Sequence, residues 1–162
     1  LRCLVGSEMC IRDSCNGGYQ FGKRLYHDWK ASGHGYVDLH NALVHSCDVY
    51  FYTIGQRMGI DVMAEFGKDF GLGKATGVEL PSERSGIMPS TSWKQKAKNE
   101  QWLPGETFSA AIGQGYVTVT RLQMASLVGT VANNGVSYRP RLVQAVMDRT
   151  SGNLQELSLI HI

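Results

Sequence analysis

Three small polar residues interrupt an apolar stretch in the first third of the chain. The sequence VHSCDVYFY, residues 44–52, places Ser46, Cys47 and Asp48 among hydrophobic and aromatic residues that would otherwise predict one buried helix. Removing an unpartnered polar group from water costs roughly 2–7 kcal/mol, so any fold that encloses this stretch must give these groups partners. Three things could offset this cost: packing contacts, a bound metal, or a catalytic role for these residues.

Composition and charge exclude several classes of protein. A chain of 162 residues fits one domain or a piece of a larger one. With 43% hydrophobic and 19% charged residues, it is typical of globular proteins and not of disordered ones. The formal net charge is only +2 and the basic residues are scattered, so we expect no nucleic-acid partner. No apolar run approaches the roughly 18 residues of a transmembrane helix, and no signal peptide opens the chain.

The two ends of the chain differ from its body. LRCLVGSEMCIRDS at the start and LSLIHI at the end resemble translated sequencing-adapter sequence that occurs on unrelated fragments. We therefore expect residues 1–14 and 157–162 to be non-native and the domain to span residues 15–156. The spacing of the four cysteines matches no compact disulfide framework, and Cys3 and Cys10 belong to the foreign leader.

The first half of the body predicts a glycine-rich loop followed by helices. Residues 15–36 are rich in glycine and aromatic residues and predict a loop or a short irregular hairpin. Aspartates and glycines then give start and stop signals for helices. We expect helices from the N-cap Asp38 to Ser46, from Val49 to Met58, and from the N-cap Asp61 to the glycines at 71 and 73.

The second half predicts a long irregular segment, two helices and a hairpin. Residues 73–92 lack periodicity and are expected to form a surface excursion. Ser90 is the expected start of a short helix whose Lys94, Lys96 and Lys98 form a solvated face.

Residues 120–123, TRLQ, form a capping box at the start of a further helix that ends near residues 134–135. The tail, residues 137–157, predicts a β-hairpin that turns at Ser151-Gly152. The predicted fold class is therefore α+β, mostly helical with a C-terminal hairpin.

Three stretches, in order along the chain, resemble one known family. They are HDWKASGHGYVDLHNALVHSCDVYFYTIGQRMGID, TGVELPSERSGIMPSTSWK and PGETFSAAIGQGYVTVTRLQMA. These stretches resemble the transpeptidase domain of class B penicillin-binding proteins, and within that family the penicillin-binding protein 2 subgroup. The resemblance implies part of the serine DD-peptidase fold, which β-lactamases share, and a peptidoglycan D,D-transpeptidase that cross-links the cell wall during elongation.

The family uses three active-site motifs, of which this chain carries one. Ser-x-x-Lys supplies the nucleophile, Ser-x-Asn or Ser-x-Asp lies across the cleft, and Lys-Thr-Gly binds the substrate carboxylate. Only the second is present, as Ser46-Cys47-Asp48; Lys74-Ala75-Thr76-Gly77 is not Lys-Thr-Gly. We therefore expect an internal fragment of the transpeptidase domain that does not acylate by itself.

The resemblance implies roles for Ser46 and Asp48 in the whole enzyme. There a serine attacks the D-Ala-D-Ala carbonyl of a peptidoglycan stem peptide, and β-lactams trap the same serine. Ser46 would relay a proton or donate a hydrogen bond near the lysine and the leaving nitrogen, and Asp48 would orient the lysine or the substrate amide. From the residues alone, the alternative is that Ser46 and Asp48 only cap the helix beginning at Val49.

A metal is the second expectation, with Cys15, Asp28, His34 and Cys47 as its candidate ligands. Two thiolates, an imidazole and a carboxylate form a closed tetrahedral zinc site, and a loop poor in core residues would gain folding free energy from it. Some members of the resembling subgroup carry zinc at corresponding positions. A Cys15–Cys47 disulfide and a simply buried Cys47 are the alternatives. His27, His40 and His45 are expected to be surface or capping residues.

The resemblance also implies where the parent protein works and with what. It would be anchored in the bacterial inner membrane by one span, with its catalytic domain in the periplasm and a membrane glycosyltransferase of the elongation machinery as partner. Two alternatives remain: a non-catalytic penicillin-binding-like sensor or scaffold, and a serine β-lactamase.

Overall fold

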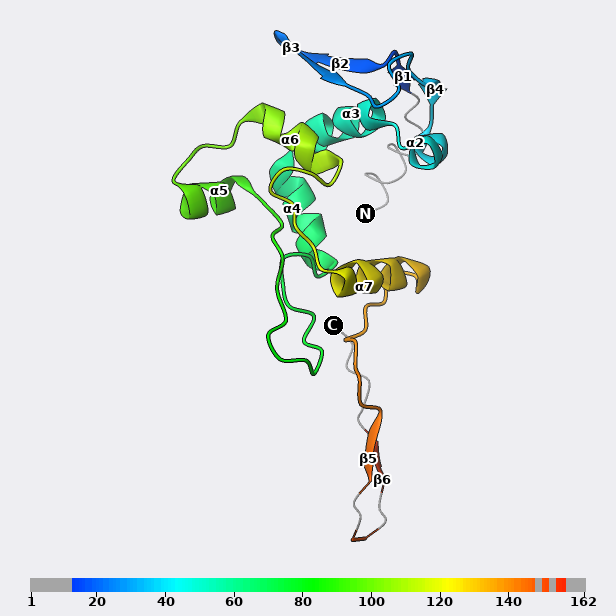
Figure 1. Cartoon of the computed structure of the whole chain (residues 1–162), viewed down its shortest axis with the longest axis vertical. Coiled ribbons are helices and arrows are strands. Elements are labelled where there is room, and N and C mark those ends of the chain that lie inside the picture. The colour runs from blue at the N-terminus through cyan, green and yellow to red at the C-terminus, as the bar shows by residue number, and fades with distance from the viewer. Residues whose placement is uncertain (1–12, 148–149, 152–153, 157–162) are drawn as a thin grey trace. The chain divides into compact units, whose positions relative to one another are not determined.

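The computed structural model describes residues 13–147, 150–151 and 154–156, and Figure 1 shows their course. The predicted non-native tail, residues 157–162, lies outside the described residues. So do residues 1–12 of the predicted non-native leader. The described part contains helices and short antiparallel β pairs, which confirms the predicted α+β class. It forms two compact units: one comprises the chain up to Met63 together with Pro89–Tyr116, the other Ala64–Met88 and the chain from Val117.

The glycine-rich start of the first unit is more regular than the sequence predicts. Strand β1 (Asp13–Cys15) pairs with β4 (Gly35–Val37), and β2 (Gly18–Phe21) pairs with β3 (Arg24–His27), both antiparallel. Gly17 makes this possible, because its φ of 86° favours glycine and a Cβ there would collide with the Ala31 carbonyl.

Two of the predicted helices follow these strands. Helix α2 (Leu39–His45) begins at the predicted N-cap Asp38, whose Oδ1 accepts a hydrogen bond of 2.8 Å from the Asn41 N–H. Helix α3 (Asp48–Met58) matches the predicted second helix. Both helices pack with β1 and β4 around the buried core of this unit, which comprises Cys15, Val37, Ala42, Cys47, Val49 and Tyr50.

Helix α6 (Pro104–Ala111) packs against α3 and was not predicted as a helix. Its start signal was present, because a proline stands at its first position and the Glu106 carboxylate accepts a 2.8 Å hydrogen bond from the Leu103 N–H. The two helices approach closely at Gly55, where an added Cβ would lie 2.6 Å from the Cβ of Ala111.

An aromatic cluster packs the β2–β3 hairpin onto α3 and α6. Phe108 of α6 is 1% exposed. Its ring centroid lies 5.3 Å from that of Tyr19, 5.1 Å from Phe21, 4.6 Å from Tyr26 and 5.8 Å from Tyr52. Tilted and edge-on contacts of this kind add to the hydrophobic burial of each ring.

Helix α5 (Thr91–Lys98) corrects one prediction about its lysines. Lys94 is only 2% exposed, and its Nζ lies 2.6 Å from Glu106 Oε1 and 3.0 Å from the Gln101 carbonyl. The prediction of a solvated face was therefore wrong for Lys94, because the partner carboxylate comes from α6, a helix that local periodicity did not reveal. Lys96 and Lys98 are exposed as predicted.

Helix α4 (Ile60–Asp69) begins two residues earlier than predicted, so Asp61 lies in its first turn and is not its N-cap. Gly59 explains the difference, because its φ of 75° ends α3. Its carbonyl then accepts a hydrogen bond from the Met63 N–H, so the next helix begins directly after it. The Asp61 carboxylate instead accepts hydrogen bonds from the backbone N–H and hydroxyl of Thr91.

The second unit is organised around helix α7 (Arg121–Ala132). The predicted capping box is confirmed: Thr120 N–H donates to Gln123 Oε1 at 2.8 Å, and Gln123 N–H donates to Thr120 Oγ1 at 3.1 Å. Gln123 is 1% exposed, and its Nε2 donates to the carbonyls of Lys74 and Ser85. The irregular 73–88 segment is thus held by a buried side chain of the capping box.

The predicted C-terminal hairpin is confirmed where the chain is described. Strand β5 (Ala145–Met147) pairs antiparallel with β6 (Leu154–Glu156), and Gly152 of the predicted turn lies outside the described residues. Among the helices of the described part, none has the length and apolarity needed to cross a membrane.

Candidate functional site

The Ser-Cys-Asp segment forms the sharp connection between α2 and α3. Ser46 ends α2 in the left-handed conformation, with φ 51° and ψ 51°, which costs a non-glycine residue roughly 1–2 kcal/mol. The Cys47 N–H donates to the Ala42 carbonyl at 2.9 Å and closes the turn. Neighbouring side chains of this segment have different surroundings, since Ser46 is exposed and Cys47 is buried.

Ser46 and Asp48 lie together on the wall of one pocket. Its volume is about 290 Å³, and its lining comprises Leu43, Ser46, Asp48, Phe51, Ala111 and Ile112. Ser46 is exposed and Asp48 is half-buried. The two polar side chains of the motif therefore face a common space with largely apolar walls.

The Asp48 carboxylate has an unusual environment for a residue in the first turn of a helix. Burial raises its pKa above the ordinary value and the Asp28 carboxylate adds to the rise, while the hydrogen bond from the Trp29 N–H and the charge of His34 act against it. Its Oδ2 accepts that hydrogen bond at 3.3 Å. The N–H of Val49, at the start of α3, instead donates to Asp28 Oδ2 at 3.2 Å. Asp28 therefore caps the start of α3, and the Asp48 side chain lines the pocket instead.

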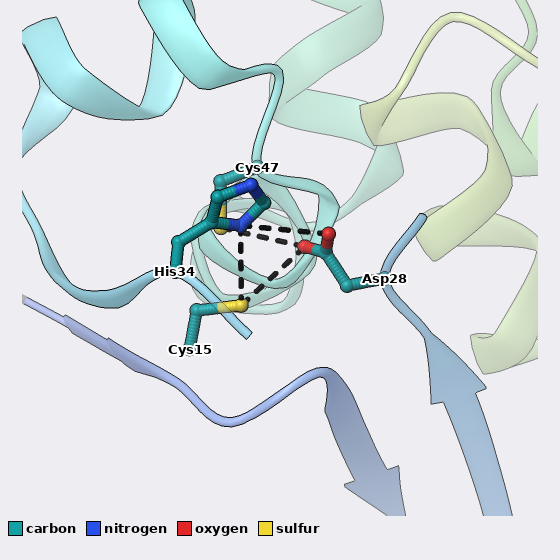
Figure 2. A group of neighbouring side chains, drawn as sticks. All are labelled: Cys15, Asp28, His34 and Cys47. Atoms are coloured by element: carbon teal, nitrogen blue, oxygen red, sulfur yellow. Dashed lines mark hydrogen bonds and ion pairs between the residues drawn. The ribbon is translucent and has the colours of Figure 1, made fainter. Parts of the chain in front are cut away.

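Cys47 does not line this pocket and lies in a buried cluster with Cys15, Asp28 and His34 (Figure 2). Each residue offers one ligand atom, and these four atoms all lie within 4.8 Å of one another. The Asp28 Oδ2 is 3.4 Å from Cys15 Sγ and 3.5 Å from Cys47 Sγ. His34 Nδ1 is 3.6 Å from Cys15 Sγ and 3.5 Å from Asp28 Oδ1.

The short β pairs bring these four residues together from distant positions in the sequence. Cys15 ends β1, Asp28 follows β3, His34 precedes β4 and Cys47 precedes α3. Two backbone hydrogen bonds of 3.0 Å fix the loop, from Asp28 N–H to the Gly17 carbonyl and from His34 N–H to the Cys15 carbonyl. The structure therefore assembles the whole predicted ligand set.

The protonation of the cluster is governed by burial and by hydrogen bonds. Burial acts to raise the pKa of Asp28, but hydrogen bonds from two backbone N–H groups, those of Lys30 and Val49, and from both thiols outweigh it and lower that pKa. Burial raises the pKa of Cys47 to about 12, and the neighbouring Cys15 adds to the effect. Both cysteines are free thiols, so the alternative disulfide is not formed.

Several separations between these atoms are those of ligands around a tetrahedral zinc ion. Zinc bonds of about 2.0–2.3 Å imply separations of about 3.3–3.8 Å between ligand atoms at the corners of a tetrahedron. Four separations in the cluster, 3.4 to 3.6 Å, fall in that range, with Asp28 Oδ2 facing the two thiols and Asp28 Oδ1 facing His34. Over all pairs, one ligand atom from each residue lies within 4.8 Å of the others. Sulfur, nitrogen and carboxylate oxygen are also the donor types that zinc prefers.

The remaining histidines of the body lie at the surface, as predicted. His27, His40 and His45 are exposed. His45, in the last turn of α2, stacks on the ring of His34 with centroids 5.9 Å apart and an interplanar angle of 17°.

One residue that contacts the site was not predicted. The Trp29 indole N–H donates to the carbonyls of both His45 and Ser46, at 3.0 Å each. Its position directly after Asp28 was the only available signal, and nothing in the sequence indicated where its side chain points.

The chain matches known proteins across most of its length. The Penicillin binding protein transpeptidase domain family matches residues 13–159. The peptidoglycan D,D-transpeptidase MrdA of Acinetobacter baumannii is 44% identical over 120 residues, which are 74% of this chain and 18% of that relative. The chain thus spans less than a fifth of the length of this relative.

Solved structures of penicillin-binding proteins also match this chain. A Pseudomonas aeruginosa PBP2 structure in complex with WCK 5153 matches with a TM-score of 0.80 and 35% identity, over 84% of this chain and 30% of that one. PBP2 of Helicobacter pylori in complex with MreC matches with a TM-score of 0.79 and 33% identity, over 91% of this chain and 27% of that one. With its Ser-Cys-Asp pocket and this ordered match, the chain belongs to the penicillin-binding protein transpeptidase domain family.

Proposed function

We propose that the full-length protein containing this segment is a penicillin-binding peptidoglycan D,D-transpeptidase that cross-links the cell wall during elongation. The observation that carries the proposal is the common pocket of Ser46 and Asp48, the motif residues that the family places across the cleft from its nucleophile. The family match and the name of the MrdA relative support it. The 162 residues contain neither Ser-x-x-Lys nor Lys-Thr-Gly, so other parts of the protein must supply them.

In this proposal Ser46 and Asp48 have distinct tasks. The Ser46 hydroxyl is both donor and acceptor, so it can pass a proton between the activating lysine and the leaving nitrogen of a stem peptide or β-lactam. Asp48, an acceptor held by the Trp29 N–H, would orient the lysine or the substrate amide.

A second proposal is that Cys15, Asp28, His34 and Cys47 hold a structural zinc ion. The close approach of four ligand atoms, within 4.8 Å of one another, and the donor set support it. When bound, the ion would tie the loops around β1, β3 and β4 to the start of α3 and would add binding free energy to folding. Because Cys47 lies between Ser46 and Asp48, the ligand set also holds the backbone of the motif.

Location and partners are part of the same proposal. The parent protein would be anchored by one span in the inner membrane, with its catalytic domain in the periplasm. A membrane glycosyltransferase of the elongation machinery would be its partner, and the MreC complex of the Helicobacter pylori relative supports membership of an assembly.

The activity is tested with purified full-length protein and a fluorescent penicillin, followed by denaturing electrophoresis. We expect a covalent adduct that persists and a cross-linked product when stem peptides and an acceptor amine are supplied. A protein that binds penicillin without forming an adduct would support the sensor or scaffold alternative. Rapid hydrolytic loss of the adduct would support the β-lactamase alternative.

Zinc is tested by elemental analysis of the full-length protein and its Cys47→Ser variant. We expect about one zinc per chain in the wild type and a large loss in the variant, because zinc prefers a thiolate to a hydroxyl. Equal zinc contents would refute Cys47 as a ligand.

A further inference from the structure

Trp29 contacts both ends of the Ser-Cys-Asp segment without belonging to it. Its indole N–H donates to the carbonyls of His45 and Ser46, and its backbone N–H donates to Asp48 Oδ2. The residue is 66% exposed, so burial of its ring does not account for its position. The hydrogen bonds of its indole N–H account for that position, because this single N–H points at the motif.

The two carbonyls that Trp29 binds lie at the C-terminal end of α2. Helix ends leave carbonyls without partners inside the helix, and these need a donor from elsewhere. Ser46 also adopts a left-handed conformation that is unfavourable for serine. The indole N–H supplies the donor at the point where the backbone turns, and so stabilises the conformation that directs Ser46 to the pocket.

Trp29 also joins the pocket to the buried cluster. It directly follows Asp28, whose carboxylate contacts both thiols, and its ring centroid lies 5.4 Å from that of His34. Consecutive residues of one loop thus serve the two sides of the motif: Asp28 contacts Cys47, and Trp29 contacts Ser46 and Asp48.

We infer that Trp29 is a positioning residue for the acylation step, acting through its indole N–H on Ser46 and through its backbone N–H on Asp48. The inference rests on the proposed transpeptidase function. Trp29 does not itself touch the reacting atoms; it fixes the directions of the two side chains that would.

The test replaces the indole N–H of Trp29 in the full-length protein. Benzothienylalanine, incorporated at position 29, keeps the shape of the ring but has sulfur in place of the N–H, and Trp29→Phe is the genetic counterpart. The first-order acylation rate constant and the noncovalent dissociation constant for a fluorescent penicillin are measured separately, together with zinc content and melting temperature.

We expect both variants to lose about tenfold to a hundredfold in the first-order acylation rate constant, since small misplacements of reacting groups have effects of that size. The dissociation constant, zinc content and melting temperature should stay close to wild type in the benzothienylalanine variant. Trp102→Phe is the matched control, because the Trp102 indole N–H donates to Thr107 Oγ1 instead. It should leave the acylation rate constant unchanged.

A benzothienylalanine variant that acylates at the wild-type rate would overturn the inference and leave the proposed function intact. A rate loss that only accompanies an equal loss of zinc or of folded protein would also overturn it, because Trp29 would then be merely structural. No acylation of the wild-type protein would overturn the proposed function and the positioning role with it.

Discussion

Asp28 shows how much of this site depends on a single side chain. Its carboxylate accepts from the N–H groups of Lys30 and Val49 and contacts the thiols of Cys15 and Cys47. It is only 5% exposed, so each of these groups would lose a partner inside the protein if the carboxylate were removed.

The Asp28→Asn variant of the full-length protein tests this dependence. Asparagine keeps the size but presents an N–H₂ group to donors, so we expect a loss of about 1.5–3 kcal/mol in the free energy of unfolding and a lower zinc content. Urea unfolding and metal analysis measure the two effects. Asp69→Asn is the control, because Asp69 is an exposed aspartate at the end of α4, outside the cluster. Equal effects of the two substitutions would contradict this account.

The candidate ligands could be predicted from the sequence, but their surroundings could not. Cysteine, histidine and aspartate are few in this loop and chemically distinctive, so their types, together with the family resemblance, indicated Cys15, Asp28, His34 and Cys47. The contact of Trp29 with Ser46 and the burial of Lys94 depend on which segments meet in space. Neither leaves a signal in local composition or periodicity.

At the scale of the helices and strands, the α3–α6 contact leaves no room for a larger side chain. Gly55 lets the two helices approach, since an added Cβ would lie 2.6 Å from the Cβ of Ala111. Protein interiors tolerate such overlap poorly, because neighbouring groups are already in contact.

Gly55→Ala should therefore destabilise the protein by about 1–3 kcal/mol through overpacking, although alanine favours helices more than glycine does. Gly129→Ala in α7 is the matched control, because a Cβ there meets nothing within 4 Å. We expect that variant to gain up to about 1 kcal/mol. Chemical denaturation of the full-length protein measures both. Stabilisation by both substitutions would show that α6 does not pack on α3 as described.

The irregular segment between α4 and α5 is organised by Glu83. Its carboxylate accepts from the Thr76 hydroxyl at 2.6 Å, from the Thr76 N–H at 2.8 Å and from the Gly77 N–H at 2.9 Å. The hydroxyl contact, followed by the two backbone contacts, lowers the pKa of Glu83 below its usual value of 4.5.

This shift predicts a pH dependence of stability. A carboxyl whose pKa is lower in the folded state stabilises that state above its unfolded pKa and loses the contribution as pH falls through its folded pKa. The stability difference between wild type and Glu83→Gln should therefore be full near neutral pH and should shrink below pH 4.5. Urea unfolding of both proteins between neutral and acid pH measures it. A difference that does not change with pH would contradict the assigned hydrogen bonds.

Prediction from sequence succeeded for helices whose start signals are local. The N-cap Asp38 and the capping box of Thr120 and Gln123 both formed as expected. Helix α6 was overlooked because its proline and glycine at 104–105 are equally typical of a turn. The β1–β4 pair was overlooked because its strands are three residues each and lie 19 residues apart in the sequence.

At the scale of the whole molecule, the chain holds one of the three active-site motifs of its family. It matches 18% of the length of the Acinetobacter baumannii relative. We predict that the 162-residue chain alone forms no adduct with fluorescent penicillin, because it contains no Ser-x-x-Lys to supply a nucleophile. Gel fluorescence after denaturation checks this. A covalent adduct on the isolated chain would show that some other residue is acylated.

In the proposed function, this segment contributes Ser46 to the acylation machinery of a transpeptidase. The most direct test is the second-order rate constant for acylation of the full-length protein by a fluorescent penicillin, compared among wild type, Ser46→Ala and the exposed control Ser92→Ala. We predict a loss of about a hundredfold or more for Ser46→Ala, in the range typical of proton-transfer groups, and none for Ser92→Ala. Equal rate constants for wild type and Ser46→Ala would contradict the claim.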